Sequence, residues 1–169
     1  MKLFKKLAAA VLVAALALTM VGCGGRNSLT DQIKDVIADF YAMEDKDVTN
    51  KKELDALAAK LMAEADKAAA KAENKGKTVL ELLIDEEVVK AAGINAAKET
   101  YRVSAVENYK LLSSTVSKEK ALLFALELTD SENEQIGGGV LDPNSYGLAM
   151  GKINGKEYFV MLMNGQSRL

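Results

Sequence analysis

The chain of 169 residues contains no histidine and no tryptophan, and its only cysteine is Cys23. Without histidine, neither a Ser-His-Asp triad nor a His-ligated zinc or iron centre can form. Any catalysis would have to use carboxylates, lysine, tyrosine or the hydroxyl groups of serine and threonine. We therefore predict that the protein is not an enzyme and that it binds no cofactor and no metal.

The first 22 residues have the pattern of a secretory signal. Lys2, Lys5 and Lys6 precede an uninterrupted apolar run at residues 7–18, and small residues follow it. This run is too short for a membrane-spanning helix, but it has the length of a signal-peptide core. The N-terminus therefore predicts export of the chain from the cytoplasm.

The single cysteine lies where this signal ends. The surrounding stretch, "TMVGCGG", resembles the lipobox of bacterial lipoproteins. In that family Cys23 would be acylated, for example with palmitate, and would become the first residue of the mature protein. An ordinary export signal with an incidental cysteine is the alternative. With Cys23 acylated no thiol would remain for a disulfide, so packing would have to stabilise the fold.

These features predict a signal peptide at residues 1–22, a flexible tether at 23–28 and a single domain at 29–169, which is long enough for one core. The signal holds three of the 22 basic residues and none of the 24 acidic ones, so the mature chain has a net charge of −5. An acidic chain without basic clusters argues against nucleic-acid binding. We expect attachment to the outer side of the cell membrane through the lipid on Cys23.

Hydrophobic periodicity predicts four helices in this domain. With their caps they cover residues 29–40, 50–72, 78–93 and 117–128. Asn50 and Glu53 form a reciprocal capping signature for the second helix, and the stretch "TVLE" from Thr78 forms one for the third. Ser117 is expected to cap the fourth helix, and Gly93 to end the third.

Three further segments predict strands and their connections. Residues 100–106 alternate apolar and polar side chains, as a strand does. Residues 129–139 are expected to form a polar connection. Residues 141–144, "LDPN", contain the only proline of the chain and predict a turn.

The two apolar-rich runs on either side of Asn154-Gly155 predict a C-terminal hairpin. A two-residue turn places Ile153 opposite Lys156. This register puts four large side chains on one face, which we expect to meet the core: Leu148, Met150, Phe159 and Met161. The other face places small residues beside large ones, which allows a helix to approach closely; these residues are Gly147, Ala149, Gly151, Tyr158, Val160 and Leu162.

The order of these elements predicts an α+β fold. Because both faces of the hairpin are apolar, helices should cover it on both sides. The expected architecture is an α-β-α sandwich with a small central antiparallel sheet that ends in the C-terminal hairpin.

Three stretches in the same order resemble the CAP (SCP-like) domain of cysteine-rich secretory proteins, antigen 5 and pathogenesis-related proteins. The stretch "KELDALAAKLMAEADKAA" resembles its first core helix, and "VENY" at residues 106–109 resembles its Glu-Asn-Ile segment. Residues 117–163 resemble its last third, in which a helix, a loop, an "ldp" turn and two strands follow one another. The resemblance implies a CAP-like domain at residues 29–169.

The chain departs from that family where the family's metal-binding histidines lie. The corresponding stretches, "KAENKGKT" and "TDSENEQIG", contain none. Only Glu107 matches an acidic residue of the family's cavity. The resemblance therefore implies the fold and a binding role, whereas a metal site is in doubt.

Glu107, Asn108 and Tyr109 are the candidate site residues, as the lining of a small cavity. The interpretation that we favour for Glu107 is a solvated or hydrogen-bonded acid at the end of a strand. The stretch "SKEK" at residues 117–120 has the spacing of a Ser-x-x-Lys catalytic motif, but the other motifs of those enzymes are absent and a helix cap explains it better.

Together these features predict a non-catalytic lipoprotein of the cell envelope, with a degenerate CAP-like domain that binds an envelope protein or a small apolar molecule. The alternative is an unrelated small α+β lipoprotein that captures a ligand outside the cytoplasm or assists envelope assembly.

Overall fold

A computed structural model describes residues 28–109, 117–130 and 133–168. Cys23 and the predicted signal lie outside these ranges. The helices are α2 (Leu29–Met43), α3 (Lys52–Ala69), the 3₁₀ turn η1 (Ala72–Asn74), α4 (Val79–Leu83), α5 (Glu86–Ala91) and α6 (Ser117–Asp130). The strands are β1 (Thr49–Asn50), β2 (Tyr101–Glu107), β3 (Asn133–Ile136), β4 (Val140–Ile153) and β5 (Lys156–Arg168).

The strands form one sheet in the order β1-β4-β5-β2-β3. The two long hairpin strands lie in its interior, with β2 antiparallel to β5 and β3 antiparallel to β2. The two-residue strand β1 pairs with β4 in the parallel direction, so the predicted antiparallel sheet has one short parallel edge.

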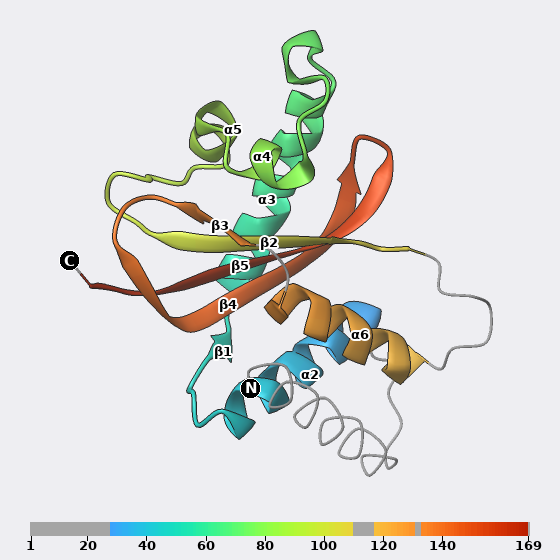
Figure 1. Cartoon of the computed structure of the whole chain (residues 1–169), viewed down its shortest axis with the longest axis vertical. Helices are drawn as coiled ribbons and strands as arrows, with labels where there is room; N and C mark the ends of the chain where they lie inside the picture. The colour runs from blue at the N-terminus through green and yellow to red at the C-terminus, as the bar shows by residue number, and fades with distance from the viewer. Residues whose placement is uncertain (1–27, 110–116, 131–132, 169) are drawn as a thin grey trace.

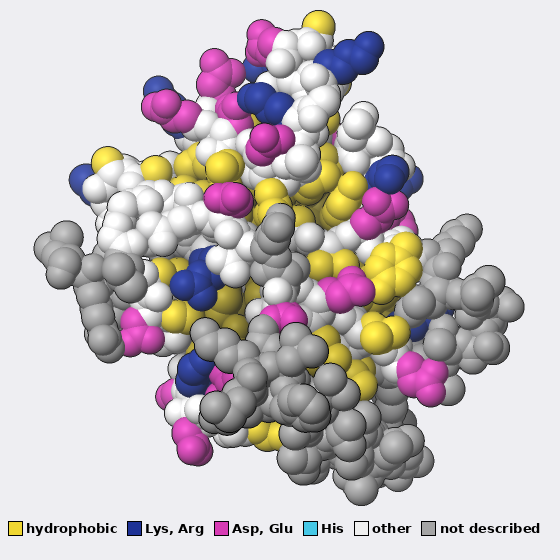
Figure 2. All heavy atoms as spheres, viewed as in Figure 1, with side chains coloured by type: hydrophobic (Ala, Val, Ile, Leu, Met, Phe, Trp, Pro, Cys, Tyr) yellow, Lys and Arg dark blue, Asp and Glu magenta, His cyan; other side chains and the backbone are white. Residues whose placement is uncertain are grey.

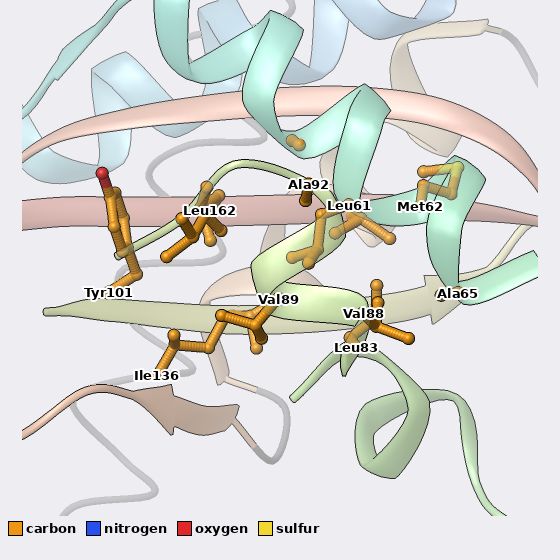
Figure 3. Packing of buried hydrophobic residues seen from close by; sticks show 14 of the residues in the cluster. Leu61, Met62, Ala65, Leu83, Val88, Val89, Ala92, Tyr101, Ile136 and Leu162 are labelled. Carbon is orange, nitrogen blue, oxygen red and sulfur yellow. The ribbon is translucent and has the colours of Figure 1, made fainter. Parts of the chain in front are cut away.

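Helices cover both faces of this sheet, as Figure 1 shows. On one face α3, α4 and α5 enclose a first core cluster, in which side chains such as Leu61 and Val89 pack toward Leu162 of the sheet (Figure 3). On the other face α2 and α6 enclose a second cluster around Phe124 and Phe159. The predicted α-β-α sandwich is confirmed.

The hairpin has the predicted register. Ile153 pairs with Lys156, and Leu148 pairs with Met161. Asn154 and Gly155 have φ angles of 52° and 78°, the left-handed values that a tight hairpin turn requires. The prediction of the core face is wrong for one residue. Met150 is 50% exposed, so α2 and α6 do not bury it.

The small residues of β4 allow α3 to approach the sheet, as predicted. A Cβ atom on Gly147 would lie 2.1 Å from the backbone carbon of Leu54, and one on Gly151 would lie 2.5 Å from the Met62 sulfur. Two carboxylates of α3 accept hydrogen bonds from backbone N–H groups of the hairpin. Asp55 accepts from Leu148, and Asp66 accepts from Asn154. The helix therefore satisfies one backbone N–H group of β4 and one of the turn.

Two of the predicted helix boundaries are wrong. Asn50 belongs to β1, and Lys51 precedes α3 without a side-chain cap, because the Asn50 amide bonds instead to Asp55 and to the Tyr146 carbonyl. The single helix expected up to Gly93 is two helices, since Asp85 accepts from the Glu87 N–H and starts α5 as a new helix. The capping box of Thr78 and Glu81 is confirmed.

The polar segments after α6 also differ from the prediction. The connection at residues 129–139 contains β3, whose polar side chains suit a solvent-facing edge strand. The expected turn at 141–144 is part of β4, where the register shifts between Pro143 and Ser145. A strand tolerates proline at such a bulge because no ladder N–H is required there. The predicted cap by Ser117 lies outside the description, since α6 begins at that residue and its side chain is not described.

Candidate functional site

The three candidate residues lie at the end of β2, beside the hairpin. Glu107 forms an ion pair with Lys156, with 2.9 Å between its Oε2 and Nζ. Asn108 continues the sheet through a hydrogen bond from its N–H to the Glu157 carbonyl, and its side-chain amide donates to the Glu157 carboxylate at 3.3 Å. Glu107 is therefore a hydrogen-bonded acid at a strand end.

Tyr109 extends from this strand end onto α6. Its hydroxyl donates to Glu127 at 2.6 Å, and its ring lies 5.4 Å from the Phe124 ring. The bond to Glu127, together with burial and the carboxylate charge, raises the pKa of Tyr109 to about 12. The phenol therefore stays protonated at neutral pH and acts as a hydrogen-bond donor, not as a base.

Substituting Glu127→Gln should return the pKa of Tyr109 from about 12 toward its ordinary value of 10, because the phenolate would no longer form beside a carboxylate. A pH titration of the tyrosine ring carbons by NMR would measure this shift. Tyr41 is the internal control, since burial chiefly raises its pKa to about 12 and should continue to do so. An unchanged Tyr109 titration would contradict the role given to Glu127.

A hollow among the described residues lies elsewhere in the molecule. It lies between the end of α3, η1 and the start of α5, and its volume is about 300 Å³. Seven of its nine lining residues are polar or charged, but polar and apolar atoms contribute about equally to its surface. The lining consists of Ala68, Lys71, Glu73, Asn74, Lys77, Asp85, Glu86, Glu87 and Val88. Glu107, Asn108 and Tyr109 are not part of it, so their role as cavity lining stays a prediction.

Ion pairs span this hollow. Lys77 lies 2.9 Å from Asp85, and Lys71 lies 3.1 Å from Glu87 and 3.8 Å from Glu73. The hydrogen bond from Lys77, which outweighs partial burial, holds the pKa of the Asp85 carboxyl below its usual value. The hollow thus presents fixed charges of both signs to solvent.

Asn74 anchors the floor of the hollow. Its side chain is only 8% exposed, and its amide donates to the Ala68 carbonyl at 2.9 Å, which satisfies the end of α3. No local sequence pattern joins residues 74–76 to residues 85–87. Their separation along the chain hid the fact that they meet.

The described ranges contain no group of three or more acidic or cysteine side chains arranged to hold a metal ion. Within the same ranges, no helix combines the length and hydropathy needed to cross a bilayer. Comparison of the chain with protein-family models, with characterised proteins and with solved structures finds no match. Function must therefore be argued from the chain itself.

Proposed function

We propose that this protein is a non-catalytic binding module of the bacterial cell envelope, exported and held to the membrane by acyl chains on Cys23. The order of its elements, with a C-terminal hairpin inside a sheet that helices cover on both faces, supports a degenerate CAP-like domain. The absence of histidine from the sequence supports a role in binding rather than catalysis.

The observation that carries a binding role is the hollow between α3, η1 and α5. Charged side chains of both signs line it, and Glu87 and Glu73 at its rim are exposed. Such a surface suits a polar segment of a partner protein better than it suits a small apolar ligand, which needs a largely apolar pocket. We therefore favour an envelope protein as the partner.

Photo-crosslinking in intact cells of the source bacterium tests this choice. A benzophenone amino acid in place of Glu87 should yield a discrete covalent adduct with one envelope protein. The same amino acid in place of Lys60, an exposed residue of α3 outside the hollow, should not yield it. Adducts of equal yield at both positions, or none at position 87, would contradict partner binding at the hollow. Bound lipid found by native mass spectrometry would instead favour an apolar ligand.

The anchor has its own test. The wild-type chain should enter the detergent phase in a phase-separation assay and incorporate labelled palmitate, whereas a Cys23→Ser variant should do neither, because the only thiol of the sequence has been removed. Wild-type protein that stays in the aqueous phase without label would show that Cys23 is not acylated.

A further inference from the structure

Three large apolar side chains are exposed at one end of the sandwich. They are Met150 (50% exposed), Tyr109 (39%) and Leu123 (38%), and we call them the apolar end patch. Contacts of neighbouring residues connect the elements that carry them. Leu123 lies one helical turn from Glu127, which accepts the hydrogen bond of Tyr109. Asn108, the neighbour of Tyr109 in the chain, approaches the Met150 sulfur at 3.9 Å. These contacts place the end of β2, α6 and β4, which carry or adjoin the three side chains, next to one another at this end of the molecule.

This patch lies at the end of the molecule where α2 begins. The helices α2 and α6 pack together in the second core cluster, which Leu29 at the start of α2 also contacts. Figure 1 shows the start of α2, the start of α6 and the end of β2 on the same side of the molecule, at the right of the view. The elements of the hollow, α5 and the end of α3, lie at the top and upper left.

The chain before α2 limits how far this end can lie from a membrane. Six peptide units connect Cys23 to Leu29, and a fully extended chain of that length reaches about 20 Å. A domain of this size has a diameter of roughly 35 Å or more, from its expected radius of gyration. The end that carries the start of α2 is therefore the part of the domain that the anchor holds nearest to the bilayer.

The chemistry of the patch suits the headgroup boundary of a bilayer. Tyrosine beside aliphatic side chains is the combination enriched at that depth, since its ring is apolar and its hydroxyl polar. Of the acids beside the patch, Glu107 is paired with the Lys156 charge, whereas Glu127 and Glu157 accept hydrogen bonds from Tyr109 and Asn108 and keep their charge. Figure 2 shows hydrophobic surface between scattered acidic side chains at this end. Even a weak contact would be populated, because the anchor makes it intramolecular.

We propose that the apolar end patch rests on the bilayer that holds the acyl chains, so that the polar hollow faces away from the membrane. This orientation depends on the proposed acylation of Cys23. It assigns the exposed side chains of Tyr109, Leu123 and Met150 a lipid surface as their partner.

The test uses the full acylated chain, reconstituted into vesicles of phosphatidylethanolamine and phosphatidylglycerol. A fluorescent nitrobenzoxadiazole label is attached to a cysteine introduced as Leu123→Cys or Met150→Cys, and the matched control is Ala63→Cys at an exposed position of α3 on the opposite face of the sheet. Only the introduced thiol reacts, because acylation blocks Cys23. Surface side chains that enter a bilayer lie about 5–10 Å deep, so headgroup-proximal doxyl lipids should quench roughly half of the emission at positions 123 and 150 and little at 63.

The outcomes are distinguishable. Equal quenching at all three positions in protein that floats with the vesicles overturns the orientation and leaves the anchor intact. Protein that does not float overturns the anchor itself. A third outcome is that the labels at positions 123 and 150 are shielded from water only at high protein concentration and are not quenched by lipid. That result would show that a second copy covers the patch, and it would also overturn the proposal. Circular dichroism of each labelled variant checks that the fold is retained.

Discussion

Replacing Gly147 by alanine should lower the free energy of unfolding by about 3 kcal/mol, the upper end of the usual cost of overpacking. The added Cβ would lie 2.1 Å from the Leu54 carbon, 2.3 Å from its oxygen and 2.4 Å from the Asp55 nitrogen. These are backbone atoms, so no side-chain rotation can relieve the contact. Either α3 moves away from β4 or the strand bends, and both loosen the first core cluster.

Urea unfolding followed by circular dichroism would measure this effect. Gly138→Ala is the matched control, because the same Cβ construction finds no atom within 4 Å of it and its φ angle is not positive. The control should change stability by less than about 0.5 kcal/mol, as surface substitutions usually do. Equal effects of the two substitutions would show that α3 does not lie as close to β4 as the structure places it.

Replacing Asp55 by alanine should cost at least about 3 kcal/mol, since each hydrogen bond to a charged group contributes about 1.5–3 kcal/mol and Asp55 accepts three of them. The carboxylate accepts from Lys34 at 2.6 Å, from the Asn50 amide at 2.9 Å and from the Leu148 N–H at 2.8 Å. Its side chain is 22% exposed. Three other elements, α2, β1 and β4, would lose their common partner, and the N–H of Leu148 would be left without an acceptor.

Asp66→Ala is the matched control on the same helix. Asp66 accepts one hydrogen bond, from the Asn154 N–H, and it is exposed, so its removal should cost about 1 kcal/mol. A loss at position 55 no larger than at position 66 would contradict the network described around Asp55.

The same carboxylate predicts a dependence of stability on pH. Burial alone would raise the pKa of Asp55, but hydrogen bonds from Lys34, Asn50 and Leu148 and the Lys34 charge outweigh it and lower the pKa below the ordinary value of 3.8. The folded state then binds this proton less readily than the unfolded state. The contribution of Asp55 is fully present above about pH 5 and is lost as the pH falls through the lowered pKa.

Unfolding experiments at several pH values between about 7 and 3 would measure this loss. The part due to Asp55 should disappear in an Asp55→Asn variant, which keeps the shape of the side chain but cannot titrate. If the stability of the two proteins fell in parallel with pH, the lowered pKa of Asp55 would be wrong.

Much of the fold was predictable because its signals are local. The turn Asn154-Gly155 fixes the register of β4 and β5, since only a two-residue turn with positive φ angles joins strands so closely. The capping box at Thr78 was also predictable, because both of its partners lie within four residues. The predictions that failed concern residues with distant partners. Asn50 bonds to Asp55 and Tyr146 instead of capping α3, and Pro143 lies in a bulge opposite Gly165 instead of a turn.

In the candidate site, too, the residues were predictable from a local pattern but their distant partners were not. Glu107, Asn108 and Tyr109 were found from a short contiguous stretch, but their partners Lys156, Glu157 and Glu127 come from β5 and α6. The hollow was not predictable from the sequence, because Lys71 and Asn74 meet Asp85 and Glu87 only when α5 packs beside the end of α3.

By itself the sequence determined the order of the main helices, of β2 and of the hairpin, the hairpin register and the absence of histidine chemistry, since each depends on residue type and local spacing. Only the tertiary structure decided that Met150 is exposed, that Gly147 is filled by the backbone of α3, and that the charged hollow and the apolar end patch exist. The physical reason is that burial and contact depend on where whole helices pack on the sheet, and short patterns of residues do not specify that position.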